Sequence, residues 1–402
     1  MIRRNPCITN LQAGYLFPEI ARRRREYAAA HPGAKIISLG IGNTTEPIPP
    51  HINAGLVEGA RRLGTAEGYS GYQDEGLVEL REKISAVFYN GKFAHEEIFI
   101  SDGAKCDIGR LQLLFGAGIT VAVQDPSYPV YVDGSVLTGA AAGIKKNGTG
   151  YGGIVYLPCT AQNNFFPDLS PLPPGSLLYF CSPNNPTGAA ADRDQLGALV
   201  NTAREKKCLI IFDAAYSEYI RDPALPKSIF EIDGAASCAI EVNSFSKSAG
   251  FTGVRLGWSV VPKELKYASG ESIHGDWSRV CATIFNGASN IVQAGGLAAL
   301  DADGLEEIRR LTDYYLGNAK LIKDTLSKHG IQSTGGENSP YIWAHFPGRD
   351  SWEVFSEILE KCQIVSTPGS GFGPSGQGFV RFSAFGRRAD ITEACRRLEQ
   401  SL

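Results

Sequence analysis

The stretch S-F-S-K-S-A-G-F-T-G-V-R-L-G-W, from Ser244 to Trp258, decides how the rest of this chain is interpreted. It follows a strand-like run, Cys238–Val242, which is rich in small and β-branched residues. Two serines precede Lys247, and Arg255 comes eight residues later. Hydroxyls and a guanidinium can hold a phosphate, and an amine can attack an aldehyde. The stretch therefore fits pyridoxal phosphate, although a polar loop with a solvated lysine has the same pattern.

Length and composition are typical of a globular enzyme. The 402 residues are enough for one large domain and a smaller one. Hydrophobic residues make up 43% of the chain and charged residues 20%, which is ordinary for a soluble protein. The net charge of −3 gives no electrostatic reason to expect a nucleic-acid partner. The six histidines are isolated, so the sequence predicts no metal site.

The cysteines and the N-terminus bear on the cellular compartment. Nine cysteines are scattered without a C-x-x-C pair, which favours reduced thiols in an intracellular protein. No apolar run approaches the length of a membrane span, so we expect no membrane partner. Arg3 and Arg4 are not followed by an apolar stretch, which argues against a secretory signal. We therefore expect a cytoplasmic protein, although a processed plastid enzyme would have the same features.

Apolar runs alternate with helical patterns from residue 97 onward. The runs are continuous rather than alternating, which is typical of strands buried on both faces. This pattern predicts an α/β fold in which helices cover a mostly parallel sheet. The runs expected to form strands include Ile98–Ser101, Thr120–Gln124, Leu177–Cys181, Cys208–Asp213 and Cys238–Asn243.

Polar residues stand where these runs end, and ligands of such sheets bind at the carboxyl ends of the strands. Asp213 ends a buried run, which is costly unless the carboxylate is paired, and a pyridinium nitrogen would be a suitable partner. Tyr216, three residues later, can reach the same ring. Asn185, in S-P-N-N-P-T-G, can present its amide to a ligand, although this motif is also an efficient turn. Arg381, which ends a later run, can bind a carboxylate through two hydrogen bonds.

These residues occur in a familiar order. The series Asn185, Asp213, Tyr216, Lys247, Arg255 and Arg381 resembles the fold-type I, class I/II aminotransferases over most of the chain. The resemblance implies a large domain with a mostly parallel seven-stranded sheet between helices, a smaller α/β domain, and a homodimer with shared active sites. The expected division is an N-terminal arm with part of the small domain (1–45), a large cofactor-binding domain (46–285) and a small C-terminal domain (286–402).

More discriminating motifs point to a subgroup. The stretches S-D-G-A-K and T-I-F-N-G-A-S are similar to those of the LL-diaminopimelate aminotransferase family. This resemblance implies transamination with pyridoxal phosphate between LL-diaminopimelate or tetrahydrodipicolinate and glutamate or 2-oxoglutarate. Such a reaction is a step in the synthesis of lysine and of peptidoglycan precursors.

The resemblance also implies a role for each matching residue. Lys247 would bond the cofactor covalently and move protons, Asp213 would pair with the pyridine nitrogen, and Asn185 and Tyr216 would bind the phenolic oxygen. The remaining cofactor contacts would come from Tyr128 on the ring face and, at the phosphate, from Ser244, Ser246, Arg255, the backbone of Ala104 and Lys105 at a helix start, and Tyr72 of the partner subunit. The implied substrate contacts are Tyr15, Gly42, Lys105, Tyr128, Asn185, Asn286 and Arg381, of which Arg381 would hold the α-carboxylate.

One loop departs from the family pattern. After Gly71 and Tyr72 the chain reads Q-D-E-G, one residue shorter than the usual loop. In the family an acidic side chain here helps to recognise the distal ammonium group of diaminopimelate. Asp74 and Glu75 are both candidates for this role.

Three alternatives share the same cofactor motifs. The nearest is another class I aminotransferase acting on aspartate, alanine or aromatic amino acids, and a wider one is a pyridoxal-phosphate lyase. The third is a non-catalytic regulator that carries a DNA-binding domain. The arm before residue 35 is too short for a helix-turn-helix, and the charge is wrong for DNA, which argues against the regulator.

Overall fold

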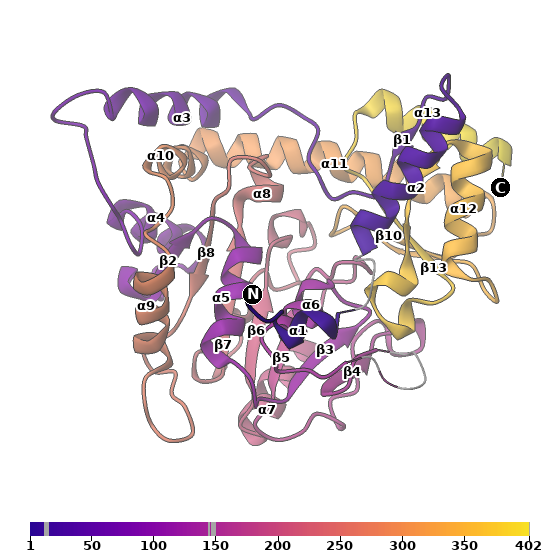
Figure 1. The fold of residues 1–402 in the computed structure, drawn as a ribbon. Helices are drawn as coiled ribbons and strands as arrows, with labels where there is room; N and C mark the ends of the chain where they lie inside the picture. The colour runs from indigo at the N-terminus through magenta and orange to yellow at the C-terminus, as the bar shows by residue number, and fades with distance from the viewer. Residues whose placement is uncertain (12–15, 144, 146–149, 402) are drawn as a thin grey trace.

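The computed structural model describes residues 1–11, 16–143, 145 and 150–401 (Figure 1). Its centre is a seven-stranded sheet in the order β2-β8-β7-β6-β5-β3-β4. Strands β3 to β7 are parallel, whereas β8 is antiparallel to both β2 and β7. The prediction of a mostly parallel seven-stranded sheet is therefore confirmed. The strands are β2 (Ile98–Ser101), β3 (Val121–Asp125), β4 (Ile154–Pro158), β5 (Leu177–Cys181), β6 (Leu209–Asp213), β7 (Ala239–Ser244) and β8 (Gly257–Val260).

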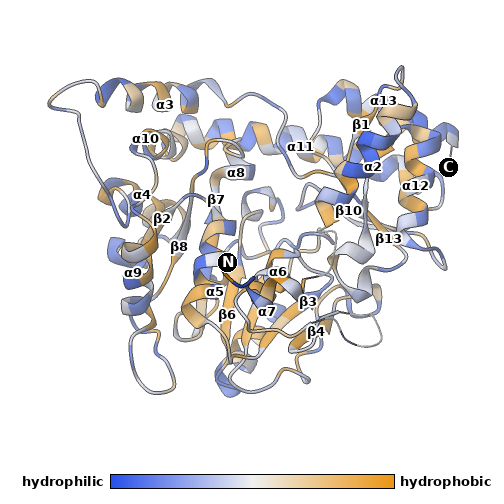
Figure 2. Ribbon diagram, in the orientation of Figure 1, coloured by the Kyte–Doolittle hydropathy of each residue, from blue (hydrophilic) through white to orange (hydrophobic). Residues whose placement is uncertain are grey.

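The continuous apolar runs are explained by burial of both faces of this sheet. Successive side chains of a strand point to opposite faces. Leu178 and Phe180 of β5 belong to one hydrophobic cluster, while Leu177 and Tyr179 belong to the other. Figure 2 shows the central strands as the hydrophobic part of the molecule. Because both faces need apolar residues, these strands could be recognised from the sequence.

Helices cover the two faces of the sheet and extend into the second lobe. One of them, α9 (Ile273–Ile284), was not predicted from the sequence. Among the described residues, no helix combines the length and apolar character that crossing a membrane would require. The helices are α1 (Pro6–Thr9), α2 (Leu16–Ala30), α3 (Pro50–Arg62), α4 (Val78–Tyr89), α5 (Ala104–Phe115), α6 (Val130–Leu137), α7 (Arg193–Glu205), α8 (Phe245–Ser248), α9 (Ile273–Ile284), α10 (Asn290–Ala299), α11 (Ala302–Lys328), α12 (Ser351–Cys362) and α13 (Arg388–Ser401).

The smaller lobe is built on a four-stranded antiparallel sheet in the order β12-β13-β10-β9. Helices α12 and α13 pack beside this sheet (Figure 1). The N-terminal arm joins the lobe because β1 (Ile37–Ser38) pairs in parallel with β11 (Ile364–Val365). The four strands are β9 (Ser333–Gly335), β10 (Tyr341–His345), β12 (Thr367–Pro368) and β13 (Phe379–Ser383).

Helices α10 and α11 connect the two lobes. Helix α10 lies beside α3 (Figure 1), and the approach is so close that a Cβ on Gly59 would lie 2.7 Å from the Cβ of Ala294. In α11, Ile308 packs into the large lobe, whereas Ile322 packs into the small lobe. The division into domains remains a proposal, and this packing favours a boundary within α11 rather than at residue 285.

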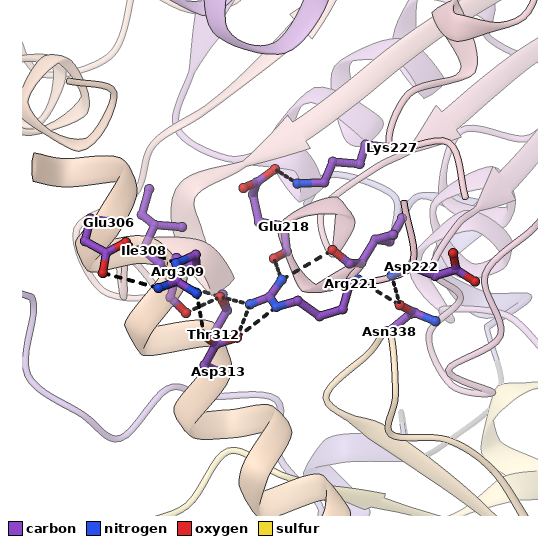
Figure 3. A network of polar contacts seen from close by, with 11 residues as sticks. Glu218, Arg221, Asp222, Lys227, Glu306, Ile308, Arg309, Thr312, Asp313 and Asn338 are labelled. Atoms are coloured by element: carbon purple, nitrogen blue, oxygen red, sulfur yellow. Dashed lines mark hydrogen bonds and ion pairs between the residues drawn. The ribbon is translucent and has the colours of Figure 1, made fainter. Parts of the chain in front are cut away.

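A polar network also ties the lobes together (Figure 3). Arg221, shortly after β6, donates from Nε to Asp313 of α11 at 2.8 Å and from Nη2 to Thr312 at 2.6 Å. Its backbone N–H donates at 2.8 Å to the side chain of Asn338, which lies just before β10. The segment after β6 is thereby held against the segment that leads into β10.

Candidate active site

A cavity of about 300 Å³ lies at the carboxyl ends of β5, β6 and β7 and is closed on one side by the small lobe. This is the expected place for a ligand in an open α/β sheet. Most residues predicted from the sequence line it: Gly42, Ala104, Lys105, Tyr128, Asn185, Asp213, Tyr216, Ser244, Ser246, Lys247, Arg255 and Arg381. The structure thus brings together residues that lie up to 339 positions apart in the chain.

Three predicted residues are not part of this group. Tyr72 is 81% exposed and lies outside the residues that line the cavity. Asn286 is likewise exposed and does not line it. Tyr15 falls outside the described residues. Neither Tyr72 nor Asn286 therefore lines the cavity of its own chain.

Lys247 lies on the single turn of α8, and its Nζ donates a hydrogen bond to the backbone carbonyl of Gly42. Burial of the amine, together with the positive charges of Arg381, Arg255 and Lys105, lowers the pKa of Lys247 to about 7. A lysine in water is protonated at neutral pH, with a pKa near 10.5. The Lys247 amine is therefore partly uncharged at pH 7, which makes it a nucleophile and a base.

Asp213 ends β6 and is buried. One carboxylate oxygen accepts a hydrogen bond from the Tyr131 hydroxyl at 2.6 Å, and the other accepts one from the backbone N–H of Ala215 at 3.0 Å. Burial raises the pKa of Asp213 because it removes water from the charged form. A cationic partner in the cavity would offset this cost. Sequence reasoning missed Tyr131, which lies one helical turn after Tyr128 in Y-P-V-Y and could have been found from that spacing.

Hydrogen-bond donors gather at one end of the cavity. Arg255 donates from Nη1 to the hydroxyl of Ser246 at 3.2 Å, and the Ser244 side chain caps α8 by accepting from the backbone N–H of Ser246 at 3.1 Å. Helix α5 begins at Ala104, and Gly103 before it provides no side-chain cap. A helix N-terminus of this kind attracts anions through its free N–H groups. This donor set suits a phosphate.

Arg381 also lines the cavity and is 1% exposed. It donates from Nη1 to Asn185 Oδ1 and from Nη2 to the carbonyl of Gly40, both at 2.6 Å. Its Nε is buried without a partner, and no described acidic residue forms an ion pair with it. Burial lowers the pKa of Arg381 relative to an exposed arginine. A buried cation with a free donor is suited to bind a carboxylate.

Tyr341 is a cavity residue that sequence reasoning did not identify. Its ring packs against the Arg381 guanidinium, with Cζ 4.3 Å from the ring centroid. Its hydroxyl lies 2.8 Å from that of Tyr216. Tyr341 begins β10, and nothing in the local sequence indicates that this strand faces the large lobe.

These residues fit pyridoxal phosphate. The phosphate donors, the partly uncharged amine of Lys247, the buried carboxylate of Asp213 and the ring of Tyr128 line a single cavity. The buried carboxylate in particular has no cation beside it among the described residues, and a protonated pyridine nitrogen would supply one.

Comparison with known proteins agrees with this geometry. The family model "Aminotransferase class I and II" matches residues 34–398. The LL-diaminopimelate aminotransferase of Protochlamydia amoebophila (strain UWE25) is 52% identical over 403 residues, covering 100% of this chain and 98% of that relative. The chloroplastic enzyme of the same name from Arabidopsis thaliana is 53% identical over 401 residues, covering 99% and 87%. The solved structure of L,L-diaminopimelate aminotransferase from Chlamydomonas reinhardtii is 56% identical, with a TM-score of 0.96 and coverage of 99% and 98%. The chain therefore belongs to the class I and II aminotransferases.

Proposed function

We propose that this aminotransferase exchanges amino groups between LL-diaminopimelate or tetrahydrodipicolinate and glutamate or 2-oxoglutarate. The observation that carries the substrate assignment is the identity of 52% to 56%, over essentially the whole chain, to proteins with that activity in their names. The cofactor is pyridoxal phosphate, which supplies an electron sink for the carbanion that forms when the α-proton leaves.

The described residues suit the steps of such a reaction. Arg381 would bind the α-carboxylate of either amino acid and fix the orientation of its α-carbon. Lys247 Nζ, with its lowered pKa, would take the proton from that carbon and return it later. Asp213 would keep the ring nitrogen protonated, because a buried carboxylate strongly favours a neighbouring cation. The charge of each of these three residues thus suits the role proposed for it.

The active site would be completed by a second subunit. Tyr72 and Asn286 are exposed on loops away from their own cavity, which is the arrangement expected if they reach the site of a partner. We therefore propose a homodimer with shared active sites. We also propose a cytoplasmic location, which is supported by nine free cysteines of which seven are buried.

Of the two acidic candidates for the distal ammonium group, we propose Asp74. Glu75 is already engaged, since it accepts from Arg81 Nη1 at 2.9 Å and from the Ser278 hydroxyl at 3.1 Å. The described structure shows no side-chain partner for Asp74, which is exposed beside Tyr72. Asp74 is thus free to bind a ligand, whereas moving Glu75 would leave the largely buried Arg81 without its ion pair.

A scan of amino donors tests this function. The purified protein with 2-oxoglutarate is expected to use LL-diaminopimelate far better than meso-diaminopimelate, aspartate, alanine or phenylalanine. Faster turnover of aspartate or an aromatic amino acid would overturn the substrate assignment and leave the family unchanged. Asp74→Asn is expected to raise KM for LL-diaminopimelate but not for glutamate. Glu79→Gln, an exposed change on α4, serves as its control.

A further inference from the structure

We propose that Asn290 is a positioning residue that holds Tyr72 in place for the active site of the partner subunit. The inference rests on the shared-site homodimer proposed above. It concerns two stretches, the Tyr72 segment (residues 70–77) and the Asn286 segment (residues 285–290). Both lie outside the cavity of their own chain.

Asn290 is the first residue of α10 and contacts the start of the Tyr72 segment. Its Nδ2 lies 2.8 Å from the Ser70 hydroxyl, 3.1 Å from the Ser70 carbonyl and 2.9 Å from the Gly71 carbonyl. These contacts end one residue before Tyr72. A single amide group therefore attaches the backbone that carries Tyr72 to a helix terminus.

Gln293, one turn later on α10, attaches the other end of the same segment. It is fully buried, and its Oε1 accepts from the backbone N–H of Leu77 at 2.7 Å. Its Nε2 donates to the Ala288 carbonyl at 2.9 Å and lies 3.3 Å from Asn290 Oδ1. The pair Asn290 and Gln293 thus joins both ends of the Tyr72 segment to the Asn286 segment.

The two segments also touch directly through backbone atoms. Gly287 has a φ of +87°, and a Cβ there would overlap the carbonyl of Gln73. Asn286 precedes Gly287, and Asp74 follows Gln73. The three side chains proposed to reach the partner, Tyr72, Asp74 and Asn286, are therefore carried on one connected unit.

This unit needs restraint, because residues 70–77 contain no helix or strand. An unrestrained loop loses conformational entropy when it binds, and this loss weakens binding. The hydrogen bonds of Asn290 remove part of that loss before the cofactor arrives. Losing them is expected to weaken binding of the cofactor phosphate about tenfold, the effect of one to two hydrogen bonds.

The first test measures cofactor affinity in the apoenzyme by titration with pyridoxal phosphate. Asn290→Asp removes the donors, yet an acidic residue in the first turn of α10 favours the helix dipole, so the fold should be retained. We expect affinity to fall about tenfold while the dimer mass and the unfolding midpoint stay unchanged. Ser289→Ala is the matched control, because the Ser289 side chain forms no cap hydrogen bond. Unchanged affinity in Asn290→Asp would overturn the proposal.

The second test asks which active site Asn290 serves. Mixed dimers are purified through two different tags, one chain carrying Lys247→Ala and the other Asn290→Asp. If Asn290 acts on the partner, one site of each dimer is intact, so about half of the wild-type activity returns and half of the sites bind the cofactor with wild-type affinity. If the mixed dimer is as impaired as Asn290→Asp itself, Asn290 acts within its own chain and the proposal fails.

A parallel pair separates this outcome from failure of the homodimer proposal. Tyr72→Phe combined with Lys247→Ala in the same format should also regain activity when sites are shared. Recovery in the Tyr72 pair without recovery in the Asn290 pair would refute the role of Asn290 alone. Failure of both pairs would refute the shared active site.

Discussion

The hydroxyl of Tyr216 lies 2.8 Å from the hydroxyl of Tyr341, and this contact joins the two lobes inside the cavity. Tyr216 follows β6 of the large lobe, whereas Tyr341 begins β10 of the small lobe. The same two segments meet again where Asn338 accepts hydrogen bonds from the backbone of Arg221 and Asp222. The side chain proposed to bind the phenolic oxygen of the cofactor is thus held in place by the other lobe.

Removing the Tyr341 hydroxyl should alter the absorbance and reactivity of the bound cofactor more than it alters substrate binding. Tyr216 has to donate its proton to the phenolic oxygen, so Tyr341 donates to Tyr216 and makes it a stronger donor. In Tyr341→Phe the ring against Arg381 remains. We expect kcat to fall about tenfold with little change in KM, and the pH midpoint of the cofactor absorbance to rise.

Tyr27→Phe is the control for this change, because the Tyr27 hydroxyl contacts a distant surface carbonyl, that of Glu360. An unchanged pH midpoint in Tyr341→Phe would show that the Tyr341 hydroxyl does not act on Tyr216. A large rise in KM would indicate instead that the Arg381 contact depends on that hydroxyl.

Lys247 is expected to be the point of covalent attachment. After borohydride treatment and denaturation, the wild-type chain should retain the cofactor, whereas Lys247→Ala should lose it together with its visible absorbance and transamination. The measurement is the absorbance of the denatured chain after gel filtration. Cofactor still attached to the variant would place the covalent bond on another residue.

The burial of Lys247 also predicts how stability depends on pH. Its pKa is about 7 in the folded apoenzyme and near 10.5 when unfolded, so the unfolded chain holds one more proton between these values. Stability therefore rises with pH by about 1.4 kcal/mol per unit over this window, relative to Lys247→Met. Denaturant unfolding of both proteins between pH 7 and pH 10 measures the difference. Parallel stability curves would contradict a buried, uncharged lysine.

Gly103 provides a test of the hydrogen-bond donors that are proposed to bind the cofactor phosphate. Its φ is +121°, and a Cβ would overlap Nη2 of Arg255. Gly103→Ala is therefore expected to displace Arg255 and to weaken cofactor binding at least tenfold. Gly109→Ala, on the helix α5 that follows Gly103, is the matched control, since its Cβ would meet no atom within 4 Å. The control should retain affinity and gain about 0.5–1 kcal/mol of stability. Equal cofactor affinity in the two variants would refute the role of Gly103.

The network around Arg221 should contribute to the stability of the whole chain. Arg221→Ala removes bonds to Thr312 and Asp313 and to the carbonyl of Glu218 (Figure 3), and is expected to lower the free energy of unfolding by about 2 kcal/mol. Arg309→Ala serves as the control because Arg309 is 63% exposed, so water and salt screen its ion pairs and they should add little to stability. Chemical denaturation compares the variants, and equal losses would show that the Arg221 bonds do not hold the lobes together.

Much of the fold could be predicted because its signals are local. The strands of the large sheet are buried on both faces, so they appear as continuous apolar runs. Strand β8 and helix α9 were not predicted as elements. β8 follows the stretch that contains Lys247 and Arg255, and its antiparallel place is set by pairing with the distant strand β2 as well as with β7.

By itself, the sequence determined which residues are proposed for the chemistry of the site. Asn185, Asp213, Ser244 and Lys247 lie at or just after the ends of parallel strands, which meet at one edge of the sheet whatever the remaining packing. Only the tertiary structure decided what surrounds them. Tyr341, 125 residues from Tyr216, comes from the other lobe. The exposure of Tyr72 and Asn286 likewise depends on how α10 is placed. The residues at the strand ends are neighbours because parallel strands of one sheet end at the same edge. Contacts between the lobes depend instead on side-chain packing over the whole molecule.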